Sequence, residues 1–303
     1  MMPERISDTQ NLTDRPYNKP CRSALYMPGS HERALEKAKN LAADIIIFDL
    51  EDAVAPDAKE AARAQVCETL ALGGYGARML VVRVNALETQ WGMDDVLALM
   101  PHQPDAILLP KVNTADDVLK LARHLPQSID IWAMIETPQA VLNAPEIAAT
   151  THQAPLKALV FGSNDLLKDM RAQYQADRAP LAFAMSQMVL AARAYNLLAL
   201  DGVFNDIEDG AGLQNECAQG AAFGFDGKTL IHPNQLEVTN RVFAPSEDDI
   251  AEAKAIIAAF EQAENIGAAV LKVNGKMVEI LHYHRALQLI ALANQIADGQ
   301  KMD

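Results

Sequence analysis

Short apolar runs alternate with amphipathic segments along most of this chain. Eight such runs, each long enough for one strand, lie at residues 23–27, 44–50, 78–84, 106–112, 130–136, 158–163, 197–203 and 227–231. Strands that alternate with helical segments, such as NTADDVLKLARHL at 113–125, are typical of parallel βα units. Eight units within about 210 residues predict an α/β fold of the (β/α)8 TIM-barrel type. No GxGxxG motif follows the first run, which disfavours a doubly wound dinucleotide-binding sheet.

The pattern changes after residue 236, where two long helices are expected. Ser246 can cap the amphipathic segment SEDDIAEAKAIIAAFEQAENIG, and GKMVEILHYHRALQLIALANQIA at 275–297 predicts a second helix. The apolar faces of these helices must be covered by the barrel or by another subunit. The chain is therefore expected to comprise a polar N-terminal arm at 1–21, a barrel domain at 22–245 and a C-terminal helical extension at 246–303.

Composition limits the partners and the compartment. The formal net charge of -14 argues against nucleic acid or an anionic membrane as the main partner, because both require a basic face. The three cysteines are far apart and form no CxxC pair, which fits a reducing compartment without structural zinc. The polar N-terminal residues contain no signal-like apolar stretch, and no run approaches the roughly 20 residues that span a bilayer. The expected location is cytoplasmic.

Charged and polar side chains follow nearly every predicted strand. In barrel enzymes the chemistry lies at the carboxyl ends of the strands, because these ends meet at one mouth of the closed barrel. The candidates are Asp49, Glu51, Asp52, Arg83, Asn85, Lys111, Glu136, Asn164, Asp165, Asp201, Asp206, Lys228 and His232. An unpaired buried charge costs on the order of several kcal/mol, so this concentration of charges predicts a functional site at the mouth.

Two of these carboxylates predict a metal site. Glu136 and Asp165 end neighbouring strands, so both can offer hard oxygen ligands to a small divalent cation that keeps several waters. The chemistry suggests Mg²⁺ or Mn²⁺, since zinc prefers His or Cys ligands and only His232 is at hand. The alternatives are that Glu136 caps the following helix and that Asp165 belongs to a turn.

The run IIIFDLEDAV at 45–54 places three acids directly after an apolar strand. Arg83, inside the apolar VVRVN, needs an anionic partner, and its planar fork suits a carboxylate or enolate oxygen. A purely structural ion pair between Arg83 and Glu51 or Asp52 is the alternative. The acids could also mark a strand that emerges into solvent, with Asp57 capping the next helix.

Eight motifs now occur together in order: RSALYMPGS, FDLEDAV, VVRVN, LLPKV, MIETP, FGSNDL, GFDGKTLIHPNQL and NGKMVE. In this order they resemble the citrate lyase beta subunit-like (CitE-like) family of the HpcH/HpaI aldolase superfamily, close to malyl-CoA and citramalyl-CoA lyases. The resemblance extends from about residue 22 to 290. It implies a Mg²⁺-dependent (β/α)8 carbon-carbon lyase that cleaves a 3-hydroxy-3-carboxylate acyl-CoA to a 2-oxo acid and acetyl-CoA by a retro-Claisen step.

The resemblance also assigns roles to single residues. Glu136 and Asp165 match the metal ligands, Arg83 matches the substrate-binding and catalytic arginine, and Asn164 is expected at the substrate. Asp49, Glu51 and Asp52 are expected to surround the metal and Arg83 without binding the metal themselves. Around the CoA substrate the resemblance places Tyr26, His31 and Lys37 at the CoA moiety and Ile231 and His232 at the thioester end.

One position departs from the family pattern. The related lyases carry Asp in GKMVD on a segment that reaches a neighbouring subunit's site, whereas this chain has Glu279. The resemblance implies that Glu279 is the acid/base group, although its carboxylate lies about 1 Å further out. We expect a homo-oligomer, most simply a closed trimer, in which each extension serves the next copy.

Three other functions remain open. The chain could be the citryl-thioester lyase beta subunit of a citrate lyase complex, which uses an acyl carrier protein in place of free CoA. The same site could also give a malate synthase-like or thioesterase reaction. A non-catalytic CoA-binding homologue is the third alternative, although a chain without chemistry has little reason to retain converging charges.

Overall fold

The computed structural model describes residues 16–17, 19–265 and 267–302 of the chain. Two compact units are distinguished, one formed by Cys21–Phe243 and the other containing the chain from Ala244 onward. The predicted polar arm at 1–21 lies mostly outside the described residues. The two units are described separately below.

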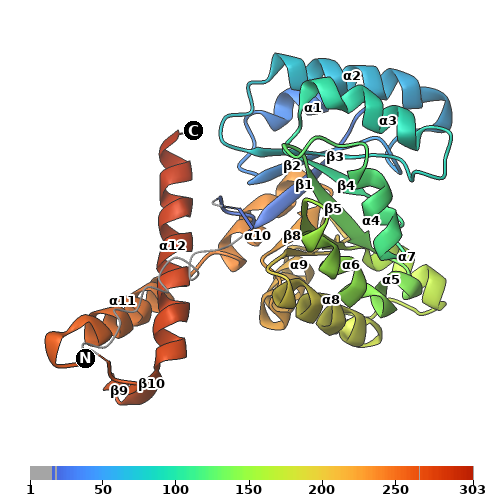
Figure 1. The fold of residues 1–303 in the computed structure, drawn as a ribbon. Helices are drawn as coiled ribbons and strands as arrows, with labels where there is room; N and C mark the ends of the chain where they lie inside the picture. Colours follow the sequence, from blue (N-terminus) through green and yellow to red (C-terminus); the bar gives the residue numbers. More distant parts are fainter. Residues whose placement is uncertain (1–15, 18, 266, 303) are drawn as a thin grey trace. The chain divides into compact units, whose positions relative to one another are not determined.

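The first unit is built around a closed barrel of eight parallel strands (Figure 1). The strands are β1 (Ser23–Pro28), β2 (Ile45–Asp49), β3 (Met79–Arg83), β4 (Ala106–Leu109), β5 (Asp130–Ile135), β6 (Leu156–Phe161), β7 (Leu198–Asp201) and β8 (Gly227–Leu230). Because β1 pairs with both β2 and β8, the sheet has no free edge. Every predicted strand forms, so the prediction of a (β/α)8 barrel is confirmed.

Helices follow the strands and surround the barrel. They are α1 (Glu32–Ala38), α2 (Lys59–Leu72), α3 (Gly92–Leu99), α4 (Ala115–Ala122), α5 (Pro138–Leu142), α6 (Ala144–Ala149), α7 (Ser163–Met170), α8 (Ala182–Ala194), α9 (Gly210–Phe223) and α10 (Leu236–Val242). The suggestion that Asp57 caps α2 is wrong, because Asp57 lies in a one-turn 3-10 helix, Pro56–Ala58, and makes no capping hydrogen bond.

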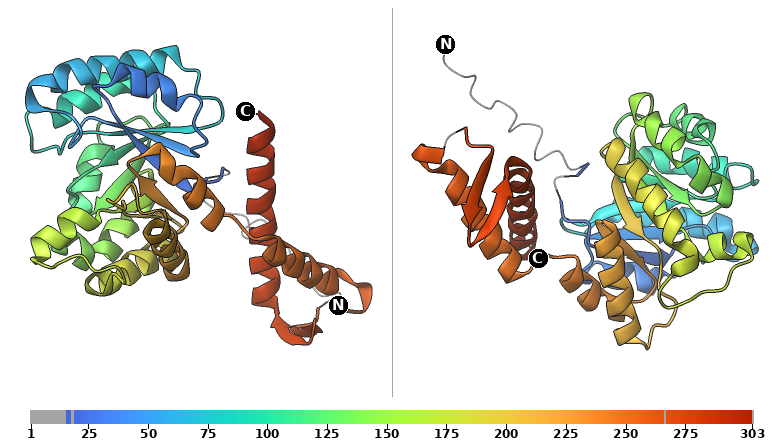
Figure 2. Two further views of the ribbon diagram at one scale, coloured as in Figure 1. Left: turned by 180° about the vertical axis from the view of Figure 1, so that it is seen from behind. Right: turned by 90° about the horizontal axis from the view of Figure 1, so that it is seen from below.

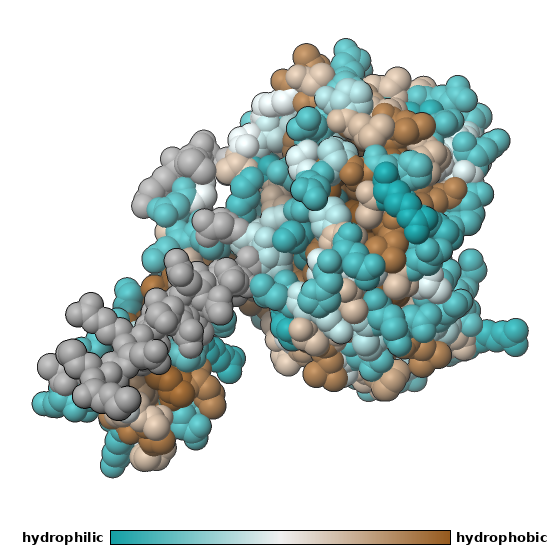
Figure 3. Space-filling model, in the orientation of Figure 1, coloured by the Kyte–Doolittle hydropathy of each residue, from teal (hydrophilic) through white to brown (hydrophobic). Residues whose placement is uncertain are grey.

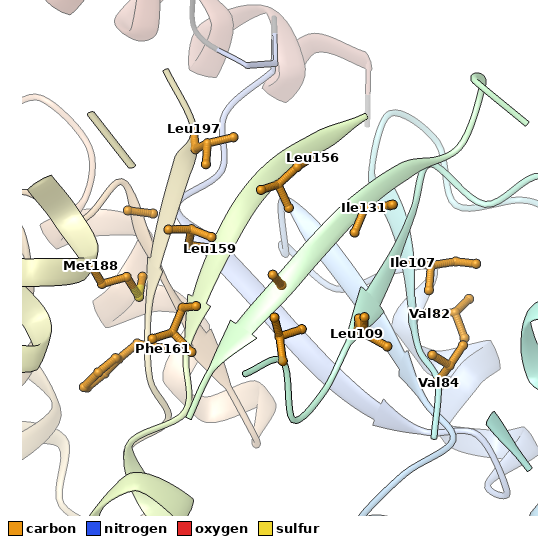
Figure 4. Close-up of a cluster of buried hydrophobic side chains, with 14 of the residues drawn as sticks. Val82, Val84, Ile107, Leu109, Ile131, Leu156, Leu159, Phe161, Met188 and Leu197 are labelled. Atoms are coloured by element: carbon orange, nitrogen blue, oxygen red, sulfur yellow. The ribbon is translucent and has the colours of Figure 1, made fainter. Parts of the chain in front are cut away.

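Side-chain alternation along the strands separates the core from the site. Val82 and Val84 belong to the apolar cluster between the strands and the helices, as do Ile107 and Leu109 of the next strand (Figure 4). Each such side chain stabilises the fold by roughly 1.5–3 kcal/mol through its removal from water. Arg83 lies between the two valines and therefore points to the opposite side of the sheet, where it lines a cavity.

In the residues that the structure describes, the second unit contains two α-helices, a one-turn 3-10 helix at Ala263–Asn265 and a hairpin (Figure 2). Its elements are α11 (Glu247–Glu261), β9 (Val270–Val273), β10 (Lys276–Glu279) and α12 (Ile280–Met302). Ser246 caps α11 as predicted, since its hydroxyl accepts a hydrogen bond from the Asp249 N–H. The two helices pack together through Ile256 and Phe260 of α11 and Tyr283 of α12.

The prediction of one continuous helix over 275–297 is wrong at its start. Residues 276–279 form strand β10, which pairs antiparallel with β9, and the helix begins only at Ile280. The reason is the turn between the strands, where Asn274 and Gly275 both have positive φ, at 50° and 82°. Asn-Gly is the preferred pair for a tight hairpin turn of this kind. Glu279 is therefore the last residue of a strand.

The surface of the barrel unit in Figure 3 is largely hydrophilic, with smaller hydrophobic areas between the polar side chains. In the part of the chain that the structure describes, no helix combines the length and apolar character needed to cross a membrane. The cytoplasmic location stays a prediction.

Candidate active site

A cavity of about 370 Å³ opens where the barrel strands end. The charged and aromatic residues that line it include Tyr26, Asp49, Arg83, Glu136 and Asp165. Tyr26, Asp49 and Arg83 belong to β1, β2 and β3, and Glu136 directly follows β5. Asp165 lies in the first turn of α7, the helix after β6, and not in a separate turn. The predicted convergence of strand-end residues at one mouth is thus what the structure shows for this set.

Arg83 and Asp49 form the central ion pair of the cavity wall. The two residues are direct partners in the register of β2 and β3. The Arg83 Nε donates to Asp49 Oδ1 at 2.7 Å and Nη2 donates to Oδ2 at 2.6 Å, a bidentate contact. Asp49 is 1% exposed and Arg83 8% exposed, so neither charge could be accommodated there alone.

The remaining guanidinium nitrogen faces two further acids. Arg83 Nη1 lies 3.0 Å from Glu51 Oε2 and 3.6 Å from Asp52 Oδ2. The structural ion pair considered for Arg83 therefore exists, with Asp49 as its main partner. Because Arg83 also lines the cavity, the pair holds the arginine in place and leaves it facing the space where a ligand would lie.

Tyr26 covers the guanidinium from β1. The Arg83 carbon Cζ lies 4.7 Å from the centre of the Tyr26 ring, a cation–π contact. Burial raises the pKa of the Tyr26 hydroxyl above its usual value, although the nearby Arg83 acts in the opposite direction. Tyr26 is therefore a neutral wall of the cavity and not simply a residue of the barrel core.

The acidic turn after β2 is anchored by a buried lysine, Lys59, which the sequence analysis did not predict. Lys59 Nζ donates to the carbonyl oxygens of Leu50 at 2.8 Å and Glu51 at 2.7 Å. Asn85 Nδ2 donates to the same Leu50 oxygen at 2.9 Å, and to Asp95 Oδ2 at 2.6 Å. These bonds fix the backbone that presents Glu51 and Asp52 to Arg83.

Glu136 and Asp165 converge on one cationic group, the ammonium of Lys111. Lys111 Nζ pairs directly with Asp165 Oδ2 and lies 3.6 Å from Glu136 Oε1. Two carboxylates that address one point are a suitable donor set for a hard divalent cation. Among the described residues, no group of three or more His, Cys, Asp or Glu side chains is placed to hold a metal. Glu136 does not cap the following helix, because Thr137 does.

Gly162 makes room for this arrangement directly after β6. A Cβ atom at this position would lie 2.4 Å from the Cβ of Glu136 and 2.8 Å from its Oε2. Only a residue without a side chain allows the two strand ends to approach so closely. The glycine of FGSNDL is therefore a packing requirement of the Glu136 carboxylate.

Asn164 and Ile231 also line the cavity, and their predicted contacts with substrate stay predictions. The Asn164 amide exchanges two hydrogen bonds with Asn205, at 3.1 and 2.8 Å. Asn205 was not anticipated, because it lies in an irregular segment after β7. His232 precedes a short 3-10 helix and its Nδ1 accepts the Asn234 N–H at 3.2 Å.

Three predicted members of the mouth do not line the cavity. Asp206 is exposed after β7, and its Oδ1 accepts the N–H groups of Glu208 and Asp209 at 3.1 and 3.2 Å.

Asp201 and Lys228 are fully buried and pair with each other at 3.1 Å, with Arg178 and Glu216 completing a network of two positive and two negative charges. Gly220 of α9 packs against the Asp201 carboxylate, so this network joins the barrel wall to a helix. The prediction that Asp201 and Lys228 lie at the shared mouth was wrong. Their charges are neutralised by each other and by Arg178 and Glu216, and neither residue lines the cavity.

The remaining predicted residues do not line the cavity. His31 and Lys37 lie at the start and near the end of α1, and both are exposed. Glu279 belongs to the second unit, is exposed, and its N–H donates to His282 Nδ1 at 2.9 Å. The roles of these three residues stay predictions.

The fold and the site define a barrel whose mouth carries a pair of carboxylates and a buried arginine in one cavity. Residues 22–233 match the HpcH/HpaI aldolase/citrate lyase family. The chain belongs to this family, which confirms the predicted resemblance and the prediction of an enzyme of a lyase family.

Several curated relatives are similar over nearly the whole chain. A (3S)-malyl-CoA thioesterase of Cereibacter sphaeroides is 50% identical over 278 residues, which cover 92% of this chain and 96% of the relative. The citrate lyase subunit beta of Leuconostoc mesenteroides is 35% identical, with 92% of this chain and 96% of the relative covered. Human mitochondrial citramalyl-CoA lyase is 31% identical, with 92% and 87% covered.

Solved structures agree with this relationship. The CitE protein of Mycobacterium tuberculosis, solved in complex with magnesium, acetoacetate and coenzyme A, matches with a TM-score of 0.77 and 31% identity. The match covers 92% of this chain and all of that one. RipC from Yersinia pestis matches with a TM-score of 0.66 and 31% identity, over 76% of this chain and 97% of its own.

Glu51 gives the site a testable pH dependence. Burial raises the pKa of Glu51 from 4.5 to about 7, despite the opposing effect of Arg83. A carboxyl group whose pKa is raised by folding binds more protons in the folded state, between the unfolded and folded pKa values. The free energy of unfolding must therefore fall as the pH rises through about 4.5 to 7, by at most about 3 kcal/mol.

We expect Glu51→Gln to remove this loss. In chelator-containing buffer, denaturant unfolding from pH 5 to pH 8, spanning roughly the Glu51 titration, should show the variant gaining stability relative to the wild type as the pH rises. Glu60→Gln, at an exposed position of α2, is the control and should follow the wild-type curve. Parallel curves for the wild type and Glu51→Gln would contradict the shifted pKa.

Proposed function

We propose that this chain is a Mg²⁺-dependent enzyme of malyl-CoA-type thioesters, and that it hydrolyses the thioester of (3S)-malyl-CoA. The main support for this proposal is that Glu136 and Asp165 both face one cation, the Lys111 ammonium, in the same region as the cavity that Arg83 lines. The thioesterase reaction is supported by relatives of that name at 50 and 51% identity over 92% of the chain.

Glu136 and Asp165 would hold the metal, Mg²⁺ or alternatively Mn²⁺. The metal would act as a Lewis acid toward the hydroxyl and carboxylate oxygens of the substrate and would orient them. Lys111 shows that one cation can meet both carboxylates, and the close packing of Gly162 on Glu136 fixes one of them. These features of the chain suit the magnesium found with its structural relative.

Arg83 would stabilise the negative charge that develops on the thioester oxygen. Hydrolysis places this charge on a tetrahedral adduct, because water adds to the thioester carbon before the carbon–sulfur bond breaks and the thiolate leaves. Asp49 holds the guanidinium rigidly, so the donor needs little reorganisation when the charge appears. Removing one such donor typically costs about 10²–10³ in turnover.

The CoA portion of the bound substrate would extend out of the cavity, past Tyr26 and toward α1. Tyr26 lines the cavity, and β1 is followed directly by α1, which carries His31 and Lys37 on its exposed surface. Lys37 could then meet a CoA phosphate as a point charge. At the thioester end the cavity offers the apolar Ile231, with His232 adjacent in the chain.

Carbon-carbon cleavage is the second candidate reaction. It is favoured by the citramalyl-CoA lyase and citrate lyase beta relatives at 31 and 35% identity. In this reaction (S)-citramalyl-CoA or malyl-CoA gives a 2-oxo acid and the enolate of acetyl-CoA. Arg83 would serve it equally, because the enolate charge lies on the same thioester oxygen. A citrate lyase complex would require an acyl carrier protein as the thiol carrier.

The products of malyl-CoA turnover distinguish the two reactions. Hydrolysis predicts one free thiol and one malate for each thioester consumed, with no glyoxylate. A thiol reagent and a carbonyl reagent measure the two outcomes in parallel, and acetyl-CoA alone controls for hydrolysis of a secondary product. Glyoxylate and acetyl-CoA without free thiol would overturn the thioesterase proposal and favour the lyase. No turnover of malyl-CoA would overturn the thioesterase proposal, and no turnover of (S)-citramalyl-CoA in addition would overturn the lyase as well.

We further propose that Glu279 acts as the acid/base group in the site of a neighbouring copy, within a trimer. The hairpin and the start of α12 carry exposed apolar side chains close to Glu279 in sequence: Val270 is 45%, Met277 67% and Leu281 56% exposed. Such residues favour burial against another surface. A repeated contact of this kind closes into a ring in which every copy is equivalent.

Subunit mixing tests this assignment. Glu279→Ala and Arg83→Ala chains should each be inactive alone and should recover activity together after subunit exchange, because mixed particles contain some sites with both groups intact. Glu264→Ala, at an exposed glutamate of the same unit, should retain activity. If proven exchange restores nothing, Glu279 does not serve a neighbouring site.

A further inference from the structure

Lys111 is bound to both members of the carboxylate pair through different parts of its structure. It follows β4, and its backbone N–H donates to Glu136 Oε1 at 2.7 Å. Its side-chain ammonium pairs with Asp165 Oδ2 and lies 3.6 Å from the same Glu136 oxygen. The ammonium therefore lies between the two carboxylates, at the position that both of them face.

The backbone at Lys111 adopts a conformation that is uncommon for a residue with a side chain. Its φ is 54°, in the left-handed region, which is unfavourable for a residue other than glycine. The surrounding contacts must offset this cost. The N–H bond to Glu136 and the ion pair with Asp165 are the contacts that do so.

Electrostatics at this point favours a divalent cation over the ammonium. Two carboxylates that face one point repel each other, and a single positive charge neutralises only half of their charge. A divalent cation at the same point would neutralise both. The ammonium and the cation cannot occupy that point together, because their positive charges would repel each other at close range.

The lysine side chain is able to leave. It is 36% exposed, whereas the Glu136 side chain is 3% exposed, so the ammonium can move into solvent without opening the barrel. The backbone bond from Lys111 to Glu136 does not depend on the side chain and would persist after such a movement. Glu136 would thus stay oriented while its cation is exchanged.

We propose that the Lys111 ammonium occupies the cation position in the metal-free protein and that a divalent cation binds by displacing it. Lys111 then stabilises the empty site and lowers its affinity for metal by the same free energy. This inference rests on the divalent-cation site of the proposed function and assigns to Lys111 the control of its affinity.

Calorimetric titration of chelator-treated protein with Mg²⁺, repeated with Mn²⁺, tests the proposal on Lys111→Met. This variant keeps most of the side-chain volume and removes the charge. We expect it to bind metal about fivefold more tightly than the wild type, the equivalent of one partly exposed ion pair. Lys168→Met, at an exposed lysine of α7, is the control for loss of charge alone and should bind as the wild type does.

Thermal unfolding provides a second readout that is independent of activity. In chelator, Lys111→Met should melt about 2 °C below the wild type, because Glu136 and Asp165 are left without their cation. At saturating Mg²⁺ the difference should vanish, since the ammonium is displaced in the wild type as well. Lys111→Gly keeps the N–H donor and suits the positive φ, so it should reproduce the tighter binding if the methionine variant folds poorly.

Three outcomes would overturn the proposal. If the wild type binds metal and both Lys111 variants bind it with the same or lower affinity, the ammonium is not displaced by the metal. That result would leave the proposed metal site intact. A melting deficit that persists at saturating Mg²⁺ would mean that Lys111 stabilises the metal-loaded form as well. No binding of Mg²⁺ or Mn²⁺ by the wild type would overturn this inference together with the metal-dependent function.

Discussion

The buried ion pair between Asp49 and Arg83 is the interaction on which the rest of the mouth depends. A guanidinium at this depth is tolerated only with a fixed anionic partner, and the register of β2 and β3 places Asp49 directly beside it. Tyr26 covers the guanidinium face, and Lys59 anchors the turn that carries Glu51. The arginine is thereby held still at the edge of the cavity, which is the condition for stabilising a charge that exists only briefly.

A second part of the cavity wall has the complementary charge. Glu136 and Asp165 attract a cation there, whereas Arg83 attracts an anion. A small hydroxy acid joined to a thioester suits both parts of the wall, because its oxygens can meet a cation at one end while the thioester oxygen meets the arginine. Under the proposed function this division of charge would serve hydrolysis and carbon-carbon cleavage alike, and both kinds of enzyme occur among the relatives.

Much of this arrangement could be predicted from the sequence, because barrel closure follows from repetition and brings strand ends together. The eight apolar runs located the strands, and the polar residues after them located Arg83, Glu136 and Asp165. Strand-end position does not reveal side-chain direction, however. Lys228 therefore looked like a member of the mouth, although it points toward α9 and is paired there.

Other features depend on geometry that periodicity does not encode. The hairpin before α12 was not predicted, because the helical spacing of apolar residues over 275–297 suggested one continuous helix. The Asn274–Gly275 pair, which favours a tight turn, indicated the hairpin. Lys111 was recognised only as a strand-end charge, since its contact with both carboxylates depends on a left-handed backbone. Spacing alone could not show that Gly162 must lack a side chain for Glu136 to fit.

The most direct test of the account is the position of a metal in crystals grown with Mn²⁺, located by its anomalous scattering. The account predicts a single strong peak within coordination distance of both Glu136 and Asp165, with the Lys111 ammonium moved away from that point. A strong peak elsewhere, or a Lys111 ammonium still between the two carboxylates in crystals saturated with metal, would contradict it.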